Sequence, residues 1–131
     1  MVMPIRWGDM DAMGHVNNTL YFRYMEVIRI EWFHLLLGGA PDRQAVGPII
    51  INAFCTFHRQ LEYPGDVRAR LYVGAMGRST IDTYTTLERT DEPGLVYASG
   101  GAAVVWTDFR ARKSVPLPDD VRQRLTGSTG E

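Results

Sequence analysis

The spacing of hydrophobic residues changes once along this chain, near residue 47. Residues 20–37 are almost entirely apolar or aromatic, and most of the strongly polar side chains among them fall three to five residues apart, as on one narrow stripe of a helix. These polar residues are Arg23, Glu26, Arg29, Glu31 and His34. A helix with so little polar surface cannot lie on the outside of a domain, so we predict that the rest of the chain wraps most of it.

After residue 47 apolar and polar residues alternate, which predicts β-strands. Further strands are expected at residues 66–73, 79–89 and 95–108, separated by turn sequences such as Tyr63-Pro64-Gly65-Asp66. Gly100-Gly101 predicts a bulge or a close approach of two backbones within the last strand. On the first strand, one face is expected to carry Ile49, Ile51, Ala53, Cys55 and Phe57.

Local signals set the ends of these elements. Asn17 and Asn18 are good N-cap residues, and Gly38-Gly39 followed by Pro41 is a stop signal, so the helix should begin near residue 18 and end near 38. Residues 2–7 are expected to form a short strand and residues 41–47 a loop. Residues 113–118 are expected to be extended, 119–125 to add about one helical turn, and 126–131 to form a frayed tail, which leaves one domain over residues 1–125.

This order of elements predicts an α+β fold in which a curved antiparallel β-sheet wraps around one long central helix. The four strands after the helix are expected to form a meander. The edges of such a sheet stay unpaired, so two copies are expected to join edge to edge as a homodimer.

Composition narrows the function classes. The chain has 131 residues, 45% hydrophobic and 22% charged, with a formal net charge of -1, which gives no reason to expect nucleic acid or an anionic membrane as a partner. Charged residues interrupt the longest apolar run, and the first residues lack the pattern of a signal peptide. Cys55 is the single cysteine, so no intrachain disulfide can form. We therefore expect a cytoplasmic protein.

The candidate chemistry lies just before the helix. Asp9, Asp11 and His15 precede the expected N-terminus, where a carboxylate can act as nucleophile or general base. The free N–H groups near Asn17 and Asn18 can stabilise a developing oxyanion. The alternative is that the acids complete a turn and the asparagines only cap the helix, because these residue types dominate turns.

The run from Trp7 to Asn18 (WGDMDAMGHVNN), with Tyr21 and Glu26 after it, resembles the signature of the hotdog-fold acyl-CoA thioesterases, in the 4-hydroxybenzoyl-CoA thioesterase-like family. The similarity continues to residues 115–118 and covers essentially the whole chain. It implies hydrolysis of a small-molecule acyl-CoA by a homodimer or homotetramer, with coenzyme A as part of the substrate and no separate cofactor. It also implies that Asp11 is the working carboxylate and that Asn18 and its neighbours polarise the thioester carbonyl.

Met13 departs from the related acyl-carrier-protein thioesterases, which carry Asn there, so the resemblance favours a coenzyme A ester. His15 is expected either to orient substrate or water or to be a hydrogen-bonded turn residue. With Gly14, Asn17 and Asn18 as the substrate-binding backbone, the candidates for the phosphates of coenzyme A are Arg59, Arg78 and Arg110.

Other side chains carry weaker cases. Cys55 is expected to be an inert core thiol, and Glu26 to pair with Arg23 or Arg29 at helical spacing. The histidines do not have the spacing of metal ligands, so no metal site is expected. Two further functions stay open: a hotdog-fold hydratase or dehydratase, and a non-catalytic acyl-CoA-binding homodimer.

Overall fold

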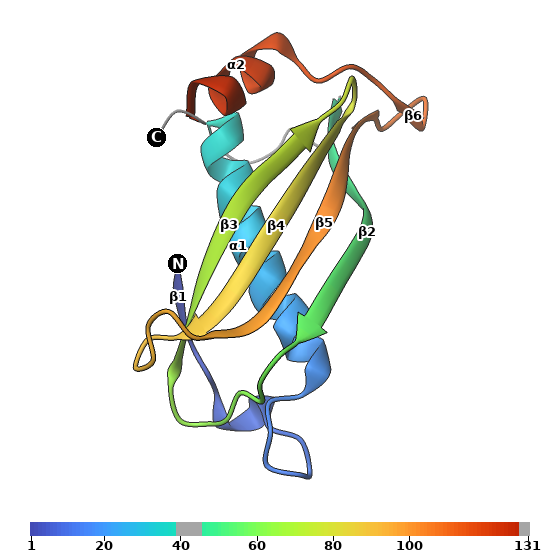
Figure 1. Ribbon diagram of the computed structural model, residues 1–131. Coiled ribbons are helices and arrows are strands. Elements are labelled where there is room, and N and C mark those ends of the chain that lie inside the picture. Colours follow the sequence, from blue (N-terminus) through green and yellow to red (C-terminus); the bar gives the residue numbers. More distant parts are fainter. Residues whose placement is uncertain (39–45, 129–131) are drawn as a thin grey trace.

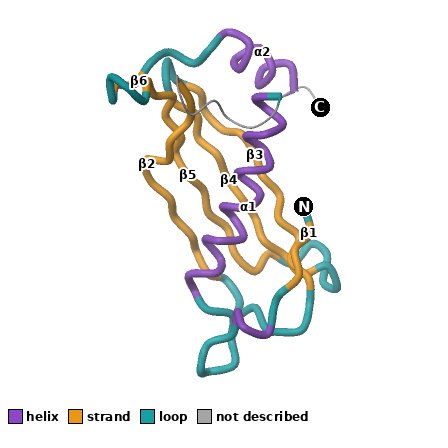
Figure 2. The backbone as a smooth tube through the Cα atoms, turned by 180° about the vertical axis from the view of Figure 1, so that it is seen from behind, coloured by secondary structure: helices purple, strands orange, loops and turns teal. Residues whose placement is uncertain are grey.

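The computed structural model describes residues 1–38 and 46–128, and in it one long helix lies along the inner face of a curved antiparallel sheet (Figures 1 and 2). This confirms the expected α+β class and the sheet-around-helix architecture. In chain order the elements are β1 (Val2–Pro4), the 3-10 turn η1 (Trp7–Asp9), α1 (Asn18–Leu37), β2 (Val46–Phe57), β3 (Asp66–Met76), β4 (Thr80–Arg89), β5 (Val96–Asp108), β6 (Lys113–Ser114) and α2 (Asp119–Ser128).

Both ends of α1 lie where the capping residues placed them. The Asn17 side chain accepts a hydrogen bond from the Thr19 N–H at 3.1 Å and caps the first turn. At the other end Gly38 takes the left-handed conformation with φ 71°, and its N–H donates to the His34 carbonyl. The expected stop is therefore confirmed at Gly38. Of the loop expected over residues 41–47, residues 41–45 lie outside the described residues, as does Gly39, and residues 46–47 already belong to β2.

The sheet is not the expected meander. Its strand order is β1-β3-β4-β5-β2, so β2 pairs with β5 and leaves β3 to pair with β1. Residues 58–65 cross below the start of α1, where the Leu61 carbonyl accepts the Val16 N–H at 2.8 Å. β2 can lie close to β5 because Gly100 of β5 has no side chain. A Cβ at this position would lie 2.1 Å from the Phe54 carbonyl oxygen of β2. The predicted close backbone approach at Gly100 is confirmed.

A bulge in β2 changes which of its side chains face the helix. Ile50 pairs with Val104 and Asn52 with Ala103, so Ile51 is an extra residue. Its insertion shifts the alternation expected from the sequence. The inner face of β2, opposite the helix, therefore carries Ile50, Ala53, Cys55 and Phe57, whereas Ile49 lies on the outer face.

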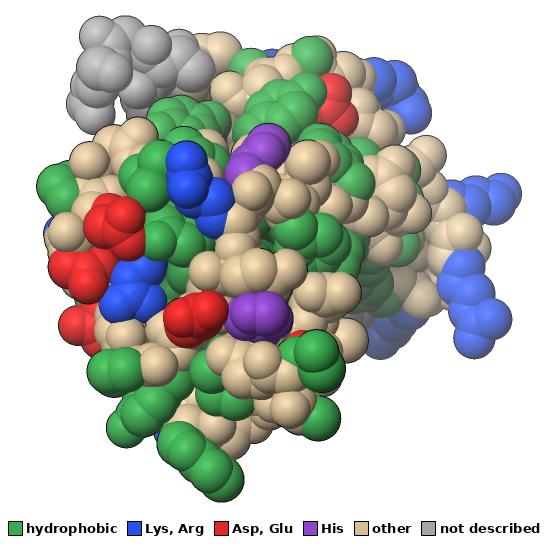
Figure 3. All heavy atoms as spheres, turned by 60° about the horizontal axis from the view of Figure 1, so that its bottom comes forward, with side chains coloured by type: hydrophobic (Ala, Val, Ile, Leu, Met, Phe, Trp, Pro, Cys, Tyr) green, Lys and Arg blue, Asp and Glu red, His purple; other side chains and the backbone are tan. Residues whose placement is uncertain are grey.

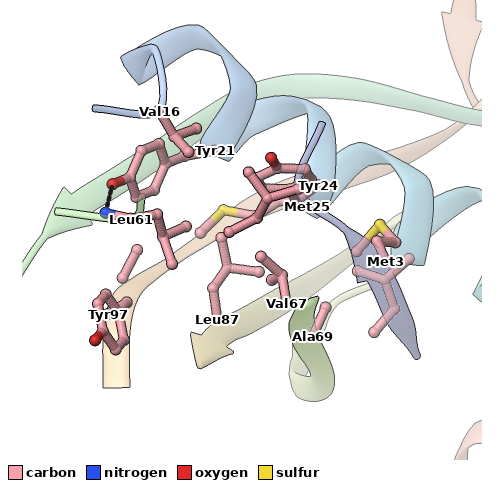
Figure 4. Close-up of a cluster of buried hydrophobic side chains, with 13 residues drawn as sticks. Met3, Val16, Tyr21, Tyr24, Met25, Leu61, Val67, Ala69, Leu87 and Tyr97 are labelled. Atoms are coloured by element: carbon pink, nitrogen blue, oxygen red, sulfur yellow. Dashed lines mark hydrogen bonds between the residues drawn. The ribbon is translucent and has the colours of Figure 1, made fainter. Parts of the chain in front are cut away.

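Two clusters of buried apolar side chains join α1 to the sheet. The first packs Tyr21, Met25 and neighbours from the N-terminal half of α1 against β3, β4 and the crossing segment (Figure 4). The second joins the C-terminal half of α1 to α2 and β5. The wrapping is nevertheless incomplete, because Phe22, Ile30 and Leu35 of α1 are 40%, 47% and 73% exposed.

The outer face of the sheet buries one carboxylate, Glu88, which is 3% exposed. It accepts hydrogen bonds from the Arg70 guanidinium at 2.7 Å and from the Gly94 N–H at 3.1 Å, and Arg68 lies 3.8 Å away. Burial raises the pKa of Glu88, but the Gly94 hydrogen bond and the two guanidinium groups outweigh it and hold the pKa below its usual range.

The two chain ends differ modestly from expectation. β1 covers only Val2–Pro4, because η1 follows within three residues, and α2 extends past Leu125 to Ser128. Residues 129–131 lie outside the described part. Neither described helix is long and apolar enough to cross a membrane.

Candidate functional site

A tight loop holds the predicted site residues directly before α1. Met10 and Val16 form an antiparallel bridge, and inside it the Asp11 N–H donates to the His15 carbonyl at 2.7 Å. Gly14, with φ 80°, closes the loop by donating its N–H to the Asp11 carbonyl at 3.2 Å. Asp11, Gly14, His15 and the start of α1 are thus brought together, at the end of the molecule that faces the viewer in Figure 3.

The two oxygens of the Asp11 carboxylate have different surroundings. Oδ1 accepts the N–H groups of Met13 at 2.8 Å and His15 at 3.1 Å, which fixes the orientation of the side chain. Within the described residues no hydrogen bond engages Oδ2, and the residue is exposed. Oδ1 is therefore held by the turn, as expected if this acid completes a turn, while Oδ2 is available to a substrate or a water molecule.

The first turn of α1 presents one unengaged backbone donor. The Asn17 N–H donates to the Asp9 carbonyl at 2.9 Å, and the Thr19 and Leu20 N–H groups donate to Asn17. Among the described residues no acceptor engages the Asn18 N–H. It combines a free donor with the positive end of the helix dipole, the arrangement that stabilises an oxyanion. The N–H groups of Gly14 and Asn17, by contrast, are already used by the loop.

Asp9 has a structural role. Its Oδ2 accepts the Arg6 N–H and the Tyr24 hydroxyl, each at 2.9 Å. Burial, followed by this hydrogen bond to Asp9, raises the pKa of the Tyr24 hydroxyl, which therefore stays protonated as the donor. Asp9 Oδ2 is thus committed to these two donors and Asp9 is partly buried, whereas the side chain of Asp11 is exposed.

Two residues that the sequence analysis gave no role support this loop. Glu62, on the crossing segment, lies 3.5 Å from His15 Nε2. The buried Tyr21 hydroxyl accepts the Leu61 N–H at 2.8 Å and donates to the Arg59 carbonyl at 3.4 Å. Tyr21 appeared in the sequence motif, but no local pattern pointed to Glu62, because its approach depends on the path of the crossing segment.

The three arginines expected at the coenzyme A phosphates lie apart. Arg59 lies two residues after the end of β2, and its carbonyl accepts the Tyr21 hydroxyl in the first turns of α1, at the same end as Asp11. Arg78 lies in the turn between β3 and β4, and Arg110 in the loop between β5 and β6, both at the opposite end of the sheet (Figure 1). A single chain therefore brings only Arg59 near the loop.

The weaker candidates have structural surroundings. Cys55 is half-buried, and burial raises the pKa of its thiol, which makes it a poor nucleophile. Glu26 pairs with Arg23 at 3.8 Å, as the helical spacing predicted. Over residues 1–38 and 46–128 no three His, Cys, Asp or Glu side chains gather as metal ligands.

Among the hollows lined by described residues, two border α1, and neither of these is lined by Asp11 or His15. One, of about 830 Å³, lies between α1 and β3 and includes Ile28, Trp32 and Leu71. The other, of about 490 Å³, lies beside β1 and includes Arg6, Arg23 and Tyr24. Asp11 is exposed, so neither of these two hollows encloses a substrate at its free oxygen.

Comparison with known proteins extends these observations. The model of the thioesterase-like superfamily matches residues 5–125. The PA2801 protein of Pseudomonas aeruginosa, classed provisionally as a thioesterase, is 36% identical with a TM-score of 0.88, and 95% of each chain is covered. A thioesterase from Thermus thermophilus, solved with coenzyme A and zinc, is 23% identical over 100% of this chain and 93% of its own, with a TM-score of 0.82. The uncharacterised protein YsmA of Bacillus subtilis is 27% identical over 81% of this chain and 78% of its own. The structural likeness confirms the hotdog fold expected from the sequence.

Proposed function

Because the chain belongs to the thioesterase-like superfamily, we propose that it is an acyl-CoA thioesterase that hydrolyses a thioester to a free acid and coenzyme A. The observation that carries this proposal is the pairing of a half-free carboxylate, Asp11, with an unengaged N–H, that of Asn18, at one loop–helix junction. The coenzyme A bound by the Thermus thermophilus relative supports the substrate class.

In this proposal the thioester oxygen receives the Asn18 N–H, where the helix dipole favours negative charge. The Asp11 Oδ2 either attacks the carbonyl carbon and expels the thiolate, giving an acyl-enzyme anhydride that water then hydrolyses, or takes a proton from an attacking water. In both routes Oδ1 stays fixed by the turn. Thiolate is a good leaving group, so the reaction needs no strong acid. His15, held near Glu62, orients the substrate or the water.

We further propose that the working form is a homodimer joined through β2. This edge strand exposes Ile49, Ile51 and Phe54 at 42%, 55% and 51%. Antiparallel pairing of two β2 edges would set the far end of each sheet beside the partner's Asp11 loop. That end carries Arg110, next to the β2 edge, and Arg78, two strands further away, so Arg110 is the better candidate for a phosphate of coenzyme A. The single cysteine fits a reducing cytoplasm.

The test is release of free thiol from a panel of aliphatic and aromatic acyl-CoAs by wild type, Asp11→Asn and the control Asp82→Asn. Asp82 lies on the outer face of β4, far from the loop. We expect Asp11→Asn to lose at least about a hundredfold in kcat/KM and Asp82→Asn to match wild type. Equal turnover by all three would refute the role of Asp11. Binding of the esters without any thiol release would instead favour the non-catalytic acyl-CoA-binding protein.

A further inference from the structure

Arg29 is buried although it is a charged residue of α1. It is 8% exposed, whereas Arg23, Glu26, Glu31 and His34 on the same helix are exposed. The Nε of Arg29 has no hydrogen-bond partner among the described residues, and no ion pair between described residues involves the Arg29 guanidinium. Burial lowers the pKa of the Arg29 guanidinium, and the nearby Glu26 carboxylate, itself exposed, offsets this only in part, so the position can take an anion from outside the described chain.

The helix geometry shows which way Arg29 points. Successive residues of an α-helix are rotated by about 100°. Ile28 lines the hollow against β3, and Met25, rotated by about 60° from it, packs into the core beneath the sheet. Arg29 lies about 40° further in the same direction, beside Phe22. With the strand order β3-β4-β5-β2, this direction leads toward β5 and β2.

The inner face of β2, defined above, is open on this side. Ile50 is 39% exposed and Ala53 is also exposed, although both point to the helix side of the sheet. On the inner face of β5, Ala102 opposite Ala53 and Gly100 opposite Cys55 have almost no side chain, whereas Val104 lies opposite Ile50. Phe57 reaches α1 only at the end of the strand, where its ring packs edge-on against Tyr21 at 4.9 Å.

Arg29 shares its stripe of α1 with the proposed oxyanion donor. Asn18, Phe22, Met25 and Arg29 are spaced four, three and four residues apart, which places them along one side of the helix. The Cα atoms of Asn18 and Arg29 are about 16 Å apart along the axis, at ~1.5 Å per residue. Long side chains on a helix lean toward its N-terminus, so the guanidinium lies closer to the thioester position than that.

We propose that Arg29 binds the far end of the acyl group, and that the preferred substrates are medium-chain coenzyme A thioesters whose acyl group ends in a carboxylate. This inference rests on the proposed function. The thioester carbonyl sits at Asn18, the acyl chain runs along Phe22 and the inner face of β2, and the carboxylate pairs with the guanidinium in a fork geometry. A single charged group in an otherwise apolar wall discriminates strongly, because a neutral acyl end leaves the cation unpaired.

The test compares kcat/KM for adipoyl-CoA and suberoyl-CoA with that for hexanoyl-CoA and octanoyl-CoA, whose chains match them in length without the carboxylate. We expect wild type to prefer the carboxylated esters at least about tenfold, the size expected for a charge-assisted hydrogen bond. Arg29→Met should remove this preference and Arg29→Lys should keep part of it. Arg23→Gln, which removes an exposed cation about 120° around α1 from Arg29, should behave as wild type. Absence of the preference in wild type would overturn the proposal without any variant.

Calorimetric binding of the same four thioesters separates the two proposals. If neutral esters are hydrolysed but carboxylated esters are neither preferred nor bound more tightly, the thioesterase proposal stands and the role of Arg29 fails. If nothing is hydrolysed, an Arg29-dependent advantage in binding of adipoyl-CoA still supports its role. Arg29→Met could instead keep the substrate preference but change the dissociation of the homodimer in analytical sedimentation. That result would show that a second copy of the chain supplies the anion, and it would overturn the proposal.

Discussion

Removing the Tyr21 hydroxyl tests whether the crossing segment fixes the Asp11 loop. In Tyr21→Phe the Leu61 N–H, on a residue that is 0% exposed, loses its acceptor at 2.8 Å. An unsatisfied buried donor costs about 1–3 kcal/mol. At ~2.1 cal/mol/K per residue, the unfolding entropy of this chain is about 0.28 kcal/mol/K, so the melting temperature should fall by about 4–11 °C.

The assay is thermal unfolding at one fixed protomer concentration, because an oligomer's melting temperature depends on concentration. Tyr84→Phe is the matched control: its side chain is 45% exposed on the outer face, and we expect a change within about 0.5 kcal/mol. Since Leu61 also accepts the Val16 N–H, Tyr21→Phe should lower kcat/KM for acyl-CoA as well. Two tyrosine variants of equal stability would refute the idea that this hydroxyl holds the segment in place.

Two further predictions concern the sheet. The pKa of the Glu88 carboxyl is lower in the folded state than its ordinary value of 4.5. The ionised carboxylate therefore stabilises the fold above that ordinary value, and this stabilisation is lost as the pH falls through the lower pKa of the folded state. Glu88→Gln should flatten the decrease in the free energy of unfolding at acid pH, measured by urea denaturation between about pH 3 and 7. Gly100→Ala would force a Cβ to within 2.1 Å of the Phe54 carbonyl oxygen and should cost at least about 2 kcal/mol, whereas Gly8→Ala, which meets nothing within 4 Å, should be mild. An unchanged decrease at acid pH, or equal melting curves for the two alanine variants, would contradict these assignments.

The features predicted correctly from the sequence are those with local causes. The start and end of α1 depend on Asn17 and Gly38, which act on backbone groups within one turn. The close approach at Gly100 was likewise visible, because a glycine inside a strand leaves room for another backbone. Alternation along residues 66–73 and 79–89 correctly marked strands β3 and β4.

The features that the sequence did not predict depend on residues distant in the chain. The choice of β5 over β3 as the partner of β2 is a pairing between separate segments, and alternation within one strand carries no information about it. The bulge at Ile51 arises within that pairing. Arg29 falls on the polar stripe that the spacing predicts, yet it is buried, because the spacing of charged residues does not reveal which of them the sheet covers.

The chemistry and the specificity proposed for this site depend on different parts of the fold. Asp11 and Asn18 belong to one loop–helix junction, fixed by hydrogen bonds at Met13, His15 and Asn17 that lie within a few residues of each other. The surfaces proposed for the acyl chain lie on α1 and an exposed edge strand, whose side chains form no part of that network. If these proposals hold, substitutions on those surfaces should change the preferred acyl group without disturbing the Asp11 carboxylate or the proposed oxyanion donor. For the same reason, a sequence motif that matches the junction identifies the reaction far better than the substrate.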